Sequence, residues 1–282
     1  MTFAEAEQYF IDALGEIYLQ REAKSLFFVW INTTLGKNKT DLVLQKDEVF
    51  NIPENDLFFV VSRLKQKEPI QYILGKTTFA DLPFFVKSGV LIPRPETEEL
   101  VNHILEEYTG TKNLQVLDIG TGSGCIAIAL AKKLDITVFG LDKNPKALAI
   151  AEENAVLNRV KINFFRHDIF DSKFPLTEKF NIIVSNPPYV LDSEKMQMDA
   201  NVVDYEPQEA LFVADNDPLL FYRQIVKLSD NLLLPDGKLF FEINEKQGDA
   251  IRNLLAENNF NDIILWQDIH GKDRFIKACY GK

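Results

Sequence analysis

The sequence lacks the features that mark disulfide-rich, membrane-spanning and secreted proteins. Only two cysteines occur, Cys125 and Cys279, and they lie far apart in a chain of 282 residues. This spacing argues against a disulfide framework and indicates a reducing compartment. No apolar run is long enough to cross a membrane, and the first residues, MTFAEAEQYF, lack the basic and apolar regions of a signal peptide. We therefore expect a cytoplasmic protein without membrane attachment.

Clustered basic residues and metal-ligand patterns are missing as well. The chain has 42 acidic and 31 basic residues, a formal charge of -11, and no Lys/Arg-rich run. Stable binding to nucleic acid is therefore not expected, because phosphate contacts need concentrated positive charge. The three histidines lack the spacing of metal ligands, and the two cysteines do not complete a site, so no metal is predicted.

The first third of the chain has apolar residues at helical spacing. The pattern predicts helices over 3–17, 22–35 and 54–67, with the segment GKNKTD as a loop after the second. Residues 77–92 then alternate loosely around Asp81-Leu82-Pro83, which predicts a β-hairpin with its turn at those residues. The segment IPRPETEEL follows, where prolines lead into the acidic first turn of a new helix.

From Gln115 onward, short apolar runs typical of buried strands alternate with segments of helical periodicity. This alternation predicts an α/β fold with a doubly wound sheet and a parallel core. We divide the chain into a small N-terminal helical domain (1–75), a connecting β-hairpin (76–95) and an α/β domain (96–282).

The first motif with chemical content is VLDIGTGSGC, where a buried strand ends at Asp118 and a loop carries Gly120, Gly122 and Gly124. Glycines permit tight turns and close approach of the backbone to a ligand. The spacing differs from the dinucleotide fingerprint, which needs its third glycine where Cys125 stands. An acid at Asp118 suits a ligand with an ammonium end, such as S-adenosylmethionine, better than a pyrophosphate.

Two further acids follow the next predicted strands. Asp142 ends TVFGLD a little over twenty residues after the first glycine, where a carboxylate can accept both hydroxyls of a ribose. Asp168, in FFRHDIF, can accept from an exocyclic amine, with Ile169 or Phe170 packing on an adenine face. By itself, each acid fits a helix cap or a turn equally well. Their order behind the glycine loop favours nucleoside binding.

The stretch IIVSNPPYVL ends a predicted strand in a stiff polar corner at Asn186, Pro187, Pro188 and Tyr189. A planar NH₂ group is a poor nucleophile, so an enzyme that alkylates it must hold both N–H bonds. The side-chain oxygen of Asn186 and the carbonyl of Pro187 supply two acceptors, and the prolines hold them rigidly. Tyr189 can stack on the planar group. The alternative is a rigid turn without chemistry.

The sequence resembles the release factor glutamine methyltransferases, the HemK/PrmC family of class I S-adenosylmethionine-dependent enzymes, over nearly its whole length. The matching segments are EPIQYILG, VLIPRPETEELV, VLDIGTGSG, SNPPYV, YEPQEAL, LLPDGKLFFEI and the closing D-x-x-G-x-x-R at Asp268, Gly271 and Arg274. Where the family often has Gly-Asp and an aromatic residue, this chain has His167, Asp168 and Ile169.

The resemblance implies a Rossmann-like, mostly parallel seven-stranded sheet, with the N-terminal domain recognising the substrate. It implies that S-adenosylmethionine is held by Gly120, Thr121, Gly122, Ser123, Gly124, Asp142, Asp168, Ile169 and Asn186. The implied catalytic residues are Asn186, Pro187 and Tyr189, which with Pro188 also bind the substrate. That substrate is the glutamine of the Gly-Gly-Gln loop of class I peptide chain release factors, and we expect the enzyme to be a monomer.

Two other functions fit the same residues. An adenine amine presents the same planar chemistry, so N6-methylation of DNA or RNA is the first alternative. Residues 1–85 carry nine basic and twelve acidic residues, which disfavours a nucleic-acid recognition domain. The second alternative is a cofactor-binding scaffold without catalysis, but mere binding does not require Asn-Pro-Pro-Tyr. The role of Glu206 stays open between orienting the substrate loop and an ordinary surface carboxylate.

Overall fold

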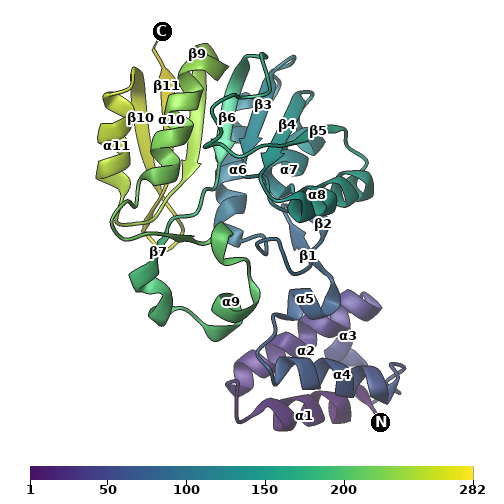
Figure 1. The fold of residues 1–282 in the computed structure, drawn as a ribbon. Helices are drawn as coiled ribbons and strands as arrows, with labels where there is room; N and C mark the ends of the chain where they lie inside the picture. Colours follow the sequence, from purple (N-terminus) through teal and green to yellow (C-terminus); the bar gives the residue numbers. More distant parts are fainter. Residues whose placement is uncertain (282) are drawn as a thin grey trace. The chain divides into compact units, whose positions relative to one another are not determined.

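The structure is a computed structural model that describes residues 1–281. These residues divide into two compact units (Figure 1). The first unit contains Met1–Gly75 together with Asp199–Tyr205, and the second contains Lys76–Met198 and the residues from Glu206 onward. The functions assigned to 1–75, 76–95 and 96–282 remain predictions.

The first unit is helical. Its helices are α1 (Phe3–Leu14), α2 (Gln20–Leu35), α3 (Lys39–Leu44), α4 (Glu54–Leu64), α5 (Ile70–Leu74) and α9 (Ala200–Tyr205). Their core is aromatic: Phe10, Phe27 and Trp30 are each no more than 2% exposed, and their rings contact one another. The tip of Tyr205 donates a hydrogen bond of 2.8 Å to the carbonyl of Gln66.

The structure corrects several of the predicted helix boundaries in this unit, and the second helix begins at Gln20, two residues earlier than predicted. The first and third helices end three residues earlier than predicted, at Leu14 and Leu64. The predicted loop GKNKTD contains the start of α3, because Asn38 accepts from the backbone of Asp41 and the Asp41 carboxylate accepts from the backbone of Asn38. This reciprocal pair satisfies two backbone donors and stabilises the short helix.

The second unit begins with the predicted β-hairpin, formed by β1 (Lys76–Phe79) and β2 (Leu82–Phe85). The turn lies at Ala80 and Asp81, both of which have positive φ. The predicted turn at Asp81-Leu82-Pro83 is therefore wrong by one residue, and Pro83 pairs with Thr78 inside the hairpin. The chain turns earlier because a two-residue loop with positive φ matches the twist of the strands.

A seven-stranded sheet forms the centre of the second unit, in the order β10-β11-β9-β6-β3-β4-β5. The bounds are β3 (Gln115–Ile119), β4 (Thr137–Asp142), β5 (Ile162–Arg166), β6 (Phe180–Ser185), β9 (Leu233–Glu242), β10 (Phe260–Gln267) and β11 (Asp273–Tyr280). The strands from β9 to β5 pair in parallel, and β11 runs antiparallel to both of its neighbours. The predicted mostly parallel seven-stranded sheet is confirmed.

Helices cover both faces of this sheet (Figure 1). Val116 packs in one apolar core with residues of α6 (Pro95–Tyr108) and α7 (Cys125–Lys133), whereas the next residue, Leu117, packs in the opposite core. The opposite core includes residues of α10 (Leu220–Leu232) and α11 (Gly248–Ala256). Alternate residues of a strand point to opposite faces, so both faces of β3 are buried. Helix α8 (Pro145–Asn158) adds Ala155 to the first core.

The connection between β6 and α10 carries only short elements in the second unit. These are β7 (Val190–Leu191), β8 (Phe212–Val213), and the 3₁₀ helices η1 (Asp192–Gln197) and η2 (Gln208–Ala210). Strands β7 and β8 pair in parallel and bring the segment after the Asn-Pro-Pro-Tyr corner beside the YEPQEAL segment. None of the helices within residues 1–281 has both the length and the apolar character needed to cross a membrane.

Candidate active site

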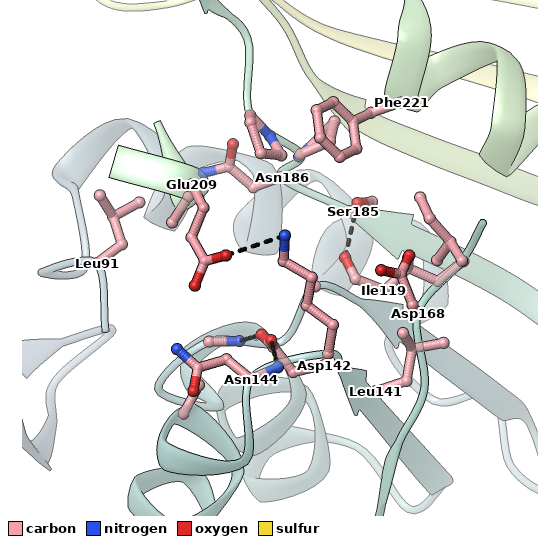
Figure 2. A pocket seen from close by; sticks show the side chains of 18 of the residues that line it. Leu91, Ile119, Leu141, Asp142, Asn144, Asp168, Ser185, Asn186, Glu209 and Phe221 are labelled. Atoms are coloured by element: carbon pink, nitrogen blue, oxygen red, sulfur yellow. Dashed lines mark hydrogen bonds and ion pairs between the residues drawn. The ribbon is translucent and has the colours of Figure 1, made fainter. Parts of the chain in front are cut away.

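A cavity lies at the carboxyl ends of four neighbouring parallel strands of the second unit, β6, β3, β4 and β5 (Figure 2). It encloses about 930 Å³ of empty space, part of which is open to solvent. The chain reverses its direction of sheet growth between β3 and β6, and open α/β sheets bind ligands at such a point. Each of the four strands contributes the residues directly at or after its end.

The glycine loop after β3 combines two roles. Gly120 and Gly122 line the cavity, and both have positive φ. A Cβ atom on Gly120 would meet nothing within 4 Å, so this backbone faces open space where a ligand can approach closely. Gly124 does not line the cavity, and a Cβ atom there would come within 3.1 Å of Ala151 in α8. The third glycine therefore permits close helix packing.

Asp118 is fully buried and lies outside the cavity lining, unlike the ligand-facing acid that the sequence suggested. Its Oδ2 accepts hydrogen bonds from the Thr121 hydroxyl (2.6 Å) and from the backbone N–H of Ala127 (3.3 Å). Burial raises the pKa of Asp118 to about 7. The carboxyl group ties the glycine loop to the start of α7. Thr121 and Ser123 are also buried outside the lining, so their contact with the cofactor remains a prediction.

Asp142, at the end of β4, points into the cavity (Figure 2). One carboxylate oxygen accepts from the backbone of Gly122 (2.9 Å), and the other accepts from the backbone of Asn144 (2.8 Å). Burial raises the pKa of Asp142, whereas the two N–H donors lower it. Each oxygen keeps a lone pair, so the carboxylate is held in one orientation and can still accept from two hydroxyl groups.

An ion pair spans part of the same cavity. The Lys143 ammonium lies 3.0 Å from the Glu209 carboxylate, and Figure 2 shows this contact as a dashed line that ends at Glu209. Both residues line the cavity, and both side chains are about half exposed. An exposed pair of this kind contributes little to stability. No motif or spacing in the sequence indicated this pair.

The end of β5 supplies a mixed polar and apolar wall. Asp168 and Ile169 line the cavity as predicted residues, and the Asp168 carboxylate also accepts from the backbone of Phe170 (3.0 Å). Phe170 lies beside Phe221 of α10, with ring centroids 5.5 Å apart. His167 also lines the cavity, and its buried Nε2 has no hydrogen-bond partner within residues 1–281. The unsatisfied nitrogen offers a bonding site to a polar ligand.

The corner after β6 brings Asn186, Pro187 and Pro188 into the cavity lining. The Asn186 side-chain NH₂ donates a hydrogen bond of 3.2 Å to the hydroxyl of Thr97. Tyr189 does not line the cavity, and its hydroxyl donates to the Glu242 carboxylate at 2.9 Å. Burial raises the pKa of Tyr189 well above its ordinary value. The predicted stacking of Tyr189 on a substrate therefore stays a prediction.

The two most specific motifs are joined by a buried ion pair. The Glu206 side chain is 1% exposed, so Glu206 is not a surface carboxylate. It accepts from the backbone of Ile92 (3.0 Å) and from the guanidinium of Arg94 (2.5 Å). These contacts tie YEPQEAL to IPRPETE. Because Pro207, Glu209 and Ala210 follow and line the cavity, Glu206 anchors one wall.

The lining fits a nucleoside. Asp142 offers acceptors for ribose hydroxyls, Gly120 leaves its backbone open, and the β5 wall offers apolar and polar groups for a base. Within residues 1–281, no group of three or more His, Cys, Asp or Glu residues could hold a metal ion. The fold and this set of groups define a class I S-adenosylmethionine-dependent methyltransferase.

Comparison with known proteins gives the family. A family model described as "Methyltransferase small domain" matches residues 95–205. The chain is 48% identical to a release factor glutamine methyltransferase of Flavobacterium psychrophilum, over 96% of each chain. It is 44% identical to one of Bacteroides thetaiotaomicron, over 96% of this chain and 97% of that one. The chain belongs to the release factor glutamine methyltransferase family.

A solved structure supports the fold. A 16S rRNA methyltransferase of T. thermophilus, in complex with AdoMet and guanosine, matches with a TM-score of 0.54 and 17% identity. The match covers 73% of this chain and 50% of that one. The predicted fold class is thus confirmed. Membership of the family confirms the predicted enzyme class and its cofactor, S-adenosylmethionine.

Proposed function

We propose that this enzyme methylates the side-chain amide nitrogen of the glutamine in the Gly-Gly-Gln loop of class I peptide chain release factors. One observation carries the proposal. The Asn186-Pro187-Pro188 corner and the ribose-type acceptor Asp142 line the same cavity, at the ends of β6 and β4, which both pair with β3. The names of the relatives that match over nearly the whole chain support the choice of substrate.

The chemistry follows from the amide group. When bound, S-adenosylmethionine supplies an electrophilic methyl carbon on a sulfonium. The Asn186 side-chain oxygen and the Pro187 carbonyl accept the two N–H bonds of the glutamine amide and orient its nitrogen lone pair. The prolines keep both acceptors in place, because fixed φ angles leave little freedom to lose. The nitrogen gains the methyl group, the carbon–sulfur bond breaks, and the nitrogen then loses one proton to water. No general base is required.

The proposal extends to the cellular location and the oligomeric state of the enzyme. We propose a cytoplasmic monomer that meets the release factor as a transient partner. Two free thiols, Cys125 and Cys279, support a reducing compartment. The net charge of -11 supports a protein substrate over nucleic acid, because the surface repels phosphate.

A methyl-transfer assay tests the proposed substrate. Labelled S-adenosylmethionine is incubated with the enzyme and a class I release factor, a factor whose loop Gln is changed to Glu, or duplex DNA and RNA oligonucleotides. We expect label on the unchanged factor alone, because a carboxylate has no nitrogen to alkylate. Label on the oligonucleotides would favour the adenine reaction, and label on the same loop position of the Gln→Glu factor would refute glutamine as the target.

A further inference from the structure

The IPRPETE motif contributes a buried threonine that the proposed chemistry does not use. Thr97 lies in the first turn of α6 and is 3% exposed. It does not line the cavity, yet its hydroxyl oxygen accepts a hydrogen bond of 3.2 Å from the Asn186 side chain. The same hydroxyl donates a bond of 2.6 Å to Glu242. Thr97 therefore links the catalytic corner to a buried carboxylate.

Strand order puts that carboxylate beside the corner. Strands β6 and β9 pair in parallel, and Ser185 lies opposite Phe241. Asn186 follows Ser185 and Glu242 follows Phe241, so Asn186 and Glu242 lie at the same edge of the sheet. Glu242 is 1% exposed, and its two oxygens accept from the hydroxyls of Thr97 and Tyr189. Burial raises the pKa of Glu242, and these two hydrogen bonds act in the opposite direction.

The direction of these hydrogen bonds decides how the Asn186 amide is turned. An ionised carboxylate only accepts, so the single proton of Thr97 is directed to Glu242. The Thr97 oxygen then has only lone pairs for Asn186, and the NH₂ end of the amide must face it. The opposite end of the amide, Oδ1, takes no part in this bond and is left to accept from the substrate. If the Asn186 amide were flipped, its Oδ1 would face the Thr97 oxygen, whose proton is directed to Glu242. The Asn186 NH₂ group would then face the N–H donors of the substrate.

We propose that Thr97 and Glu242 are positioning residues that fix the Asn186 amide in its substrate-accepting orientation. The inference rests on the proposed function for its effect on methylation, whereas the orientation of the amide is a property of the chain alone. Neither residue lines the cavity. Their effect is to exclude the orientation that would repel a glutamine amide.

The kinetic test uses the full chain and removes only the hydroxyl group. Thr97→Val keeps the shape of the side chain, and Thr97→Ser keeps the hydroxyl. We expect Thr97→Val to lower kcat on the release factor about 10- to 100-fold, as for the loss of one buried hydrogen bond. The dissociation constant of S-adenosylmethionine should change less than about threefold, and Thr97→Ser should restore most of the activity. Glu242→Gln should lower kcat similarly, because its amide can donate to a hydroxyl and reverse the direction of the bonds.

A control threonine lies directly after the other end of the same helix. The Thr109 hydroxyl donates to the carbonyl of Leu105 and has no link to Asn186, so Thr109→Val should leave kcat unchanged. A double-mutant cycle separates positioning from general stability. Asn186→Ala should itself lower kcat by about two to four orders of magnitude, and Thr97→Val should add less than about threefold in that background. Equal effects of Thr97→Val in both backgrounds would refute positioning.

A second measurement does not depend on the substrate. In the ¹⁵N spectrum of the free enzyme, the side-chain NH₂ signals of Asn186 are assigned by their loss in Asn186→Ala. We expect slow exchange of this NH₂ with solvent in the unchanged enzyme and faster exchange in Thr97→Val, because its acceptor is gone. Unchanged exchange would overturn the inference. If the wild-type enzyme left the release factor unlabelled, the proposed function would be overturned instead. The exchange result would still test the orientation of the Asn186 amide.

Discussion

At the scale of single residues, the site depends on polar side chains that are already held by hydrogen bonds within the protein. Asp142 accepts from Gly122 and Asn144, so its carboxylate is oriented without a ligand. Asn186 is held by Thr97. Preorganised groups lose little entropy on binding and therefore discriminate well between correct and incorrect geometry.

We predict that Asp142→Ala weakens the binding of S-adenosylmethionine by about 1–3 kcal/mol, because charge-assisted hydrogen bonds to the ribose are lost. Isothermal titration calorimetry measures this change directly. Asp135→Ala is the matched control, since Asp135 is an exposed acid that precedes the same strand and lies outside the cavity lining. An unchanged dissociation constant in Asp142→Ala would remove this residue from the binding site.

At the scale of elements, the loop between β3 and α7 is held together by Asp118. Its carboxyl group is 0% exposed and bonds both to Thr121 in the loop and to Ala127 in the helix. One of its oxygens, Oδ1, has no partner among the described residues. A buried carboxyl with an unpaired oxygen favours the protonated form, and this is why its pKa is raised to about 7.

The raised pKa gives the loop a dependence on pH. The folded enzyme binds a proton at Asp118 more tightly than the unfolded chain does, where the pKa is near 3.8. Its contribution to stability is therefore fully present below about pH 4 and is lost as the pH rises through about 7. From pH 5 to pH 8, we expect a loss of about 1–3 kcal/mol in the free energy of unfolding from this group.

Urea unfolding of the wild type and of Asp118→Asn across this pH range provides the test. The asparagine resembles the protonated acid and does not titrate, so this variant should lack the Asp118 part of the decline. Burial also raises the pKa of Asp142 and Glu242, so a decline of the same sign from these two groups should persist in both proteins. Parallel stability curves for the two proteins would contradict the assignment to Asp118.

At the scale of the whole molecule, the residues of the candidate active site and the helical domain belong to different units. All the residues that line the cavity belong to the second unit. The first unit contributes no residue to that lining, and its residues 1–75 precede every motif for the cofactor. We therefore assign substrate selection to the first unit as a prediction.

Deleting residues 1–75 should leave the binding of S-adenosylmethionine measurable and abolish methylation of an intact release factor, because recognition surface is lost while the cofactor residues remain. Calorimetry and the transfer assay measure the two properties separately. Circular dichroism of the fragment controls for folding, since the deletion also removes the partners of Asp199–Tyr205. A folded fragment that methylates the factor at the full rate would contradict this role.

Much of the fold follows from local patterns. The alternation of strand-like and helix-like segments after Gln115 predicts the parallel core. Each strand of such a core is followed by a helix, which carries the chain back to the edge of the sheet where the next parallel strand begins. Gly120, Asp142 and Asn186 were predictable for the same reason, since each directly follows or ends a strand whose position the pattern gives. The local pattern does not give the antiparallel place of β11 between β9 and β10, because this place depends on neighbours far along the chain.

The sequence by itself determined the fold class and the cofactor-type loop, and it predicted a chemistry for the Asn-Pro-Pro-Tyr corner. Local residue preferences and short spacings suffice for these features. Only the tertiary structure decided the partners of that corner. Thr97 lies 89 residues from Asn186 and 145 from Glu242, and the buried pair of Arg94 and Glu206 is separated by 112. Such contacts depend on strand order and on the burial of both sheet faces, which are set by the packing of the whole unit and not by any short segment.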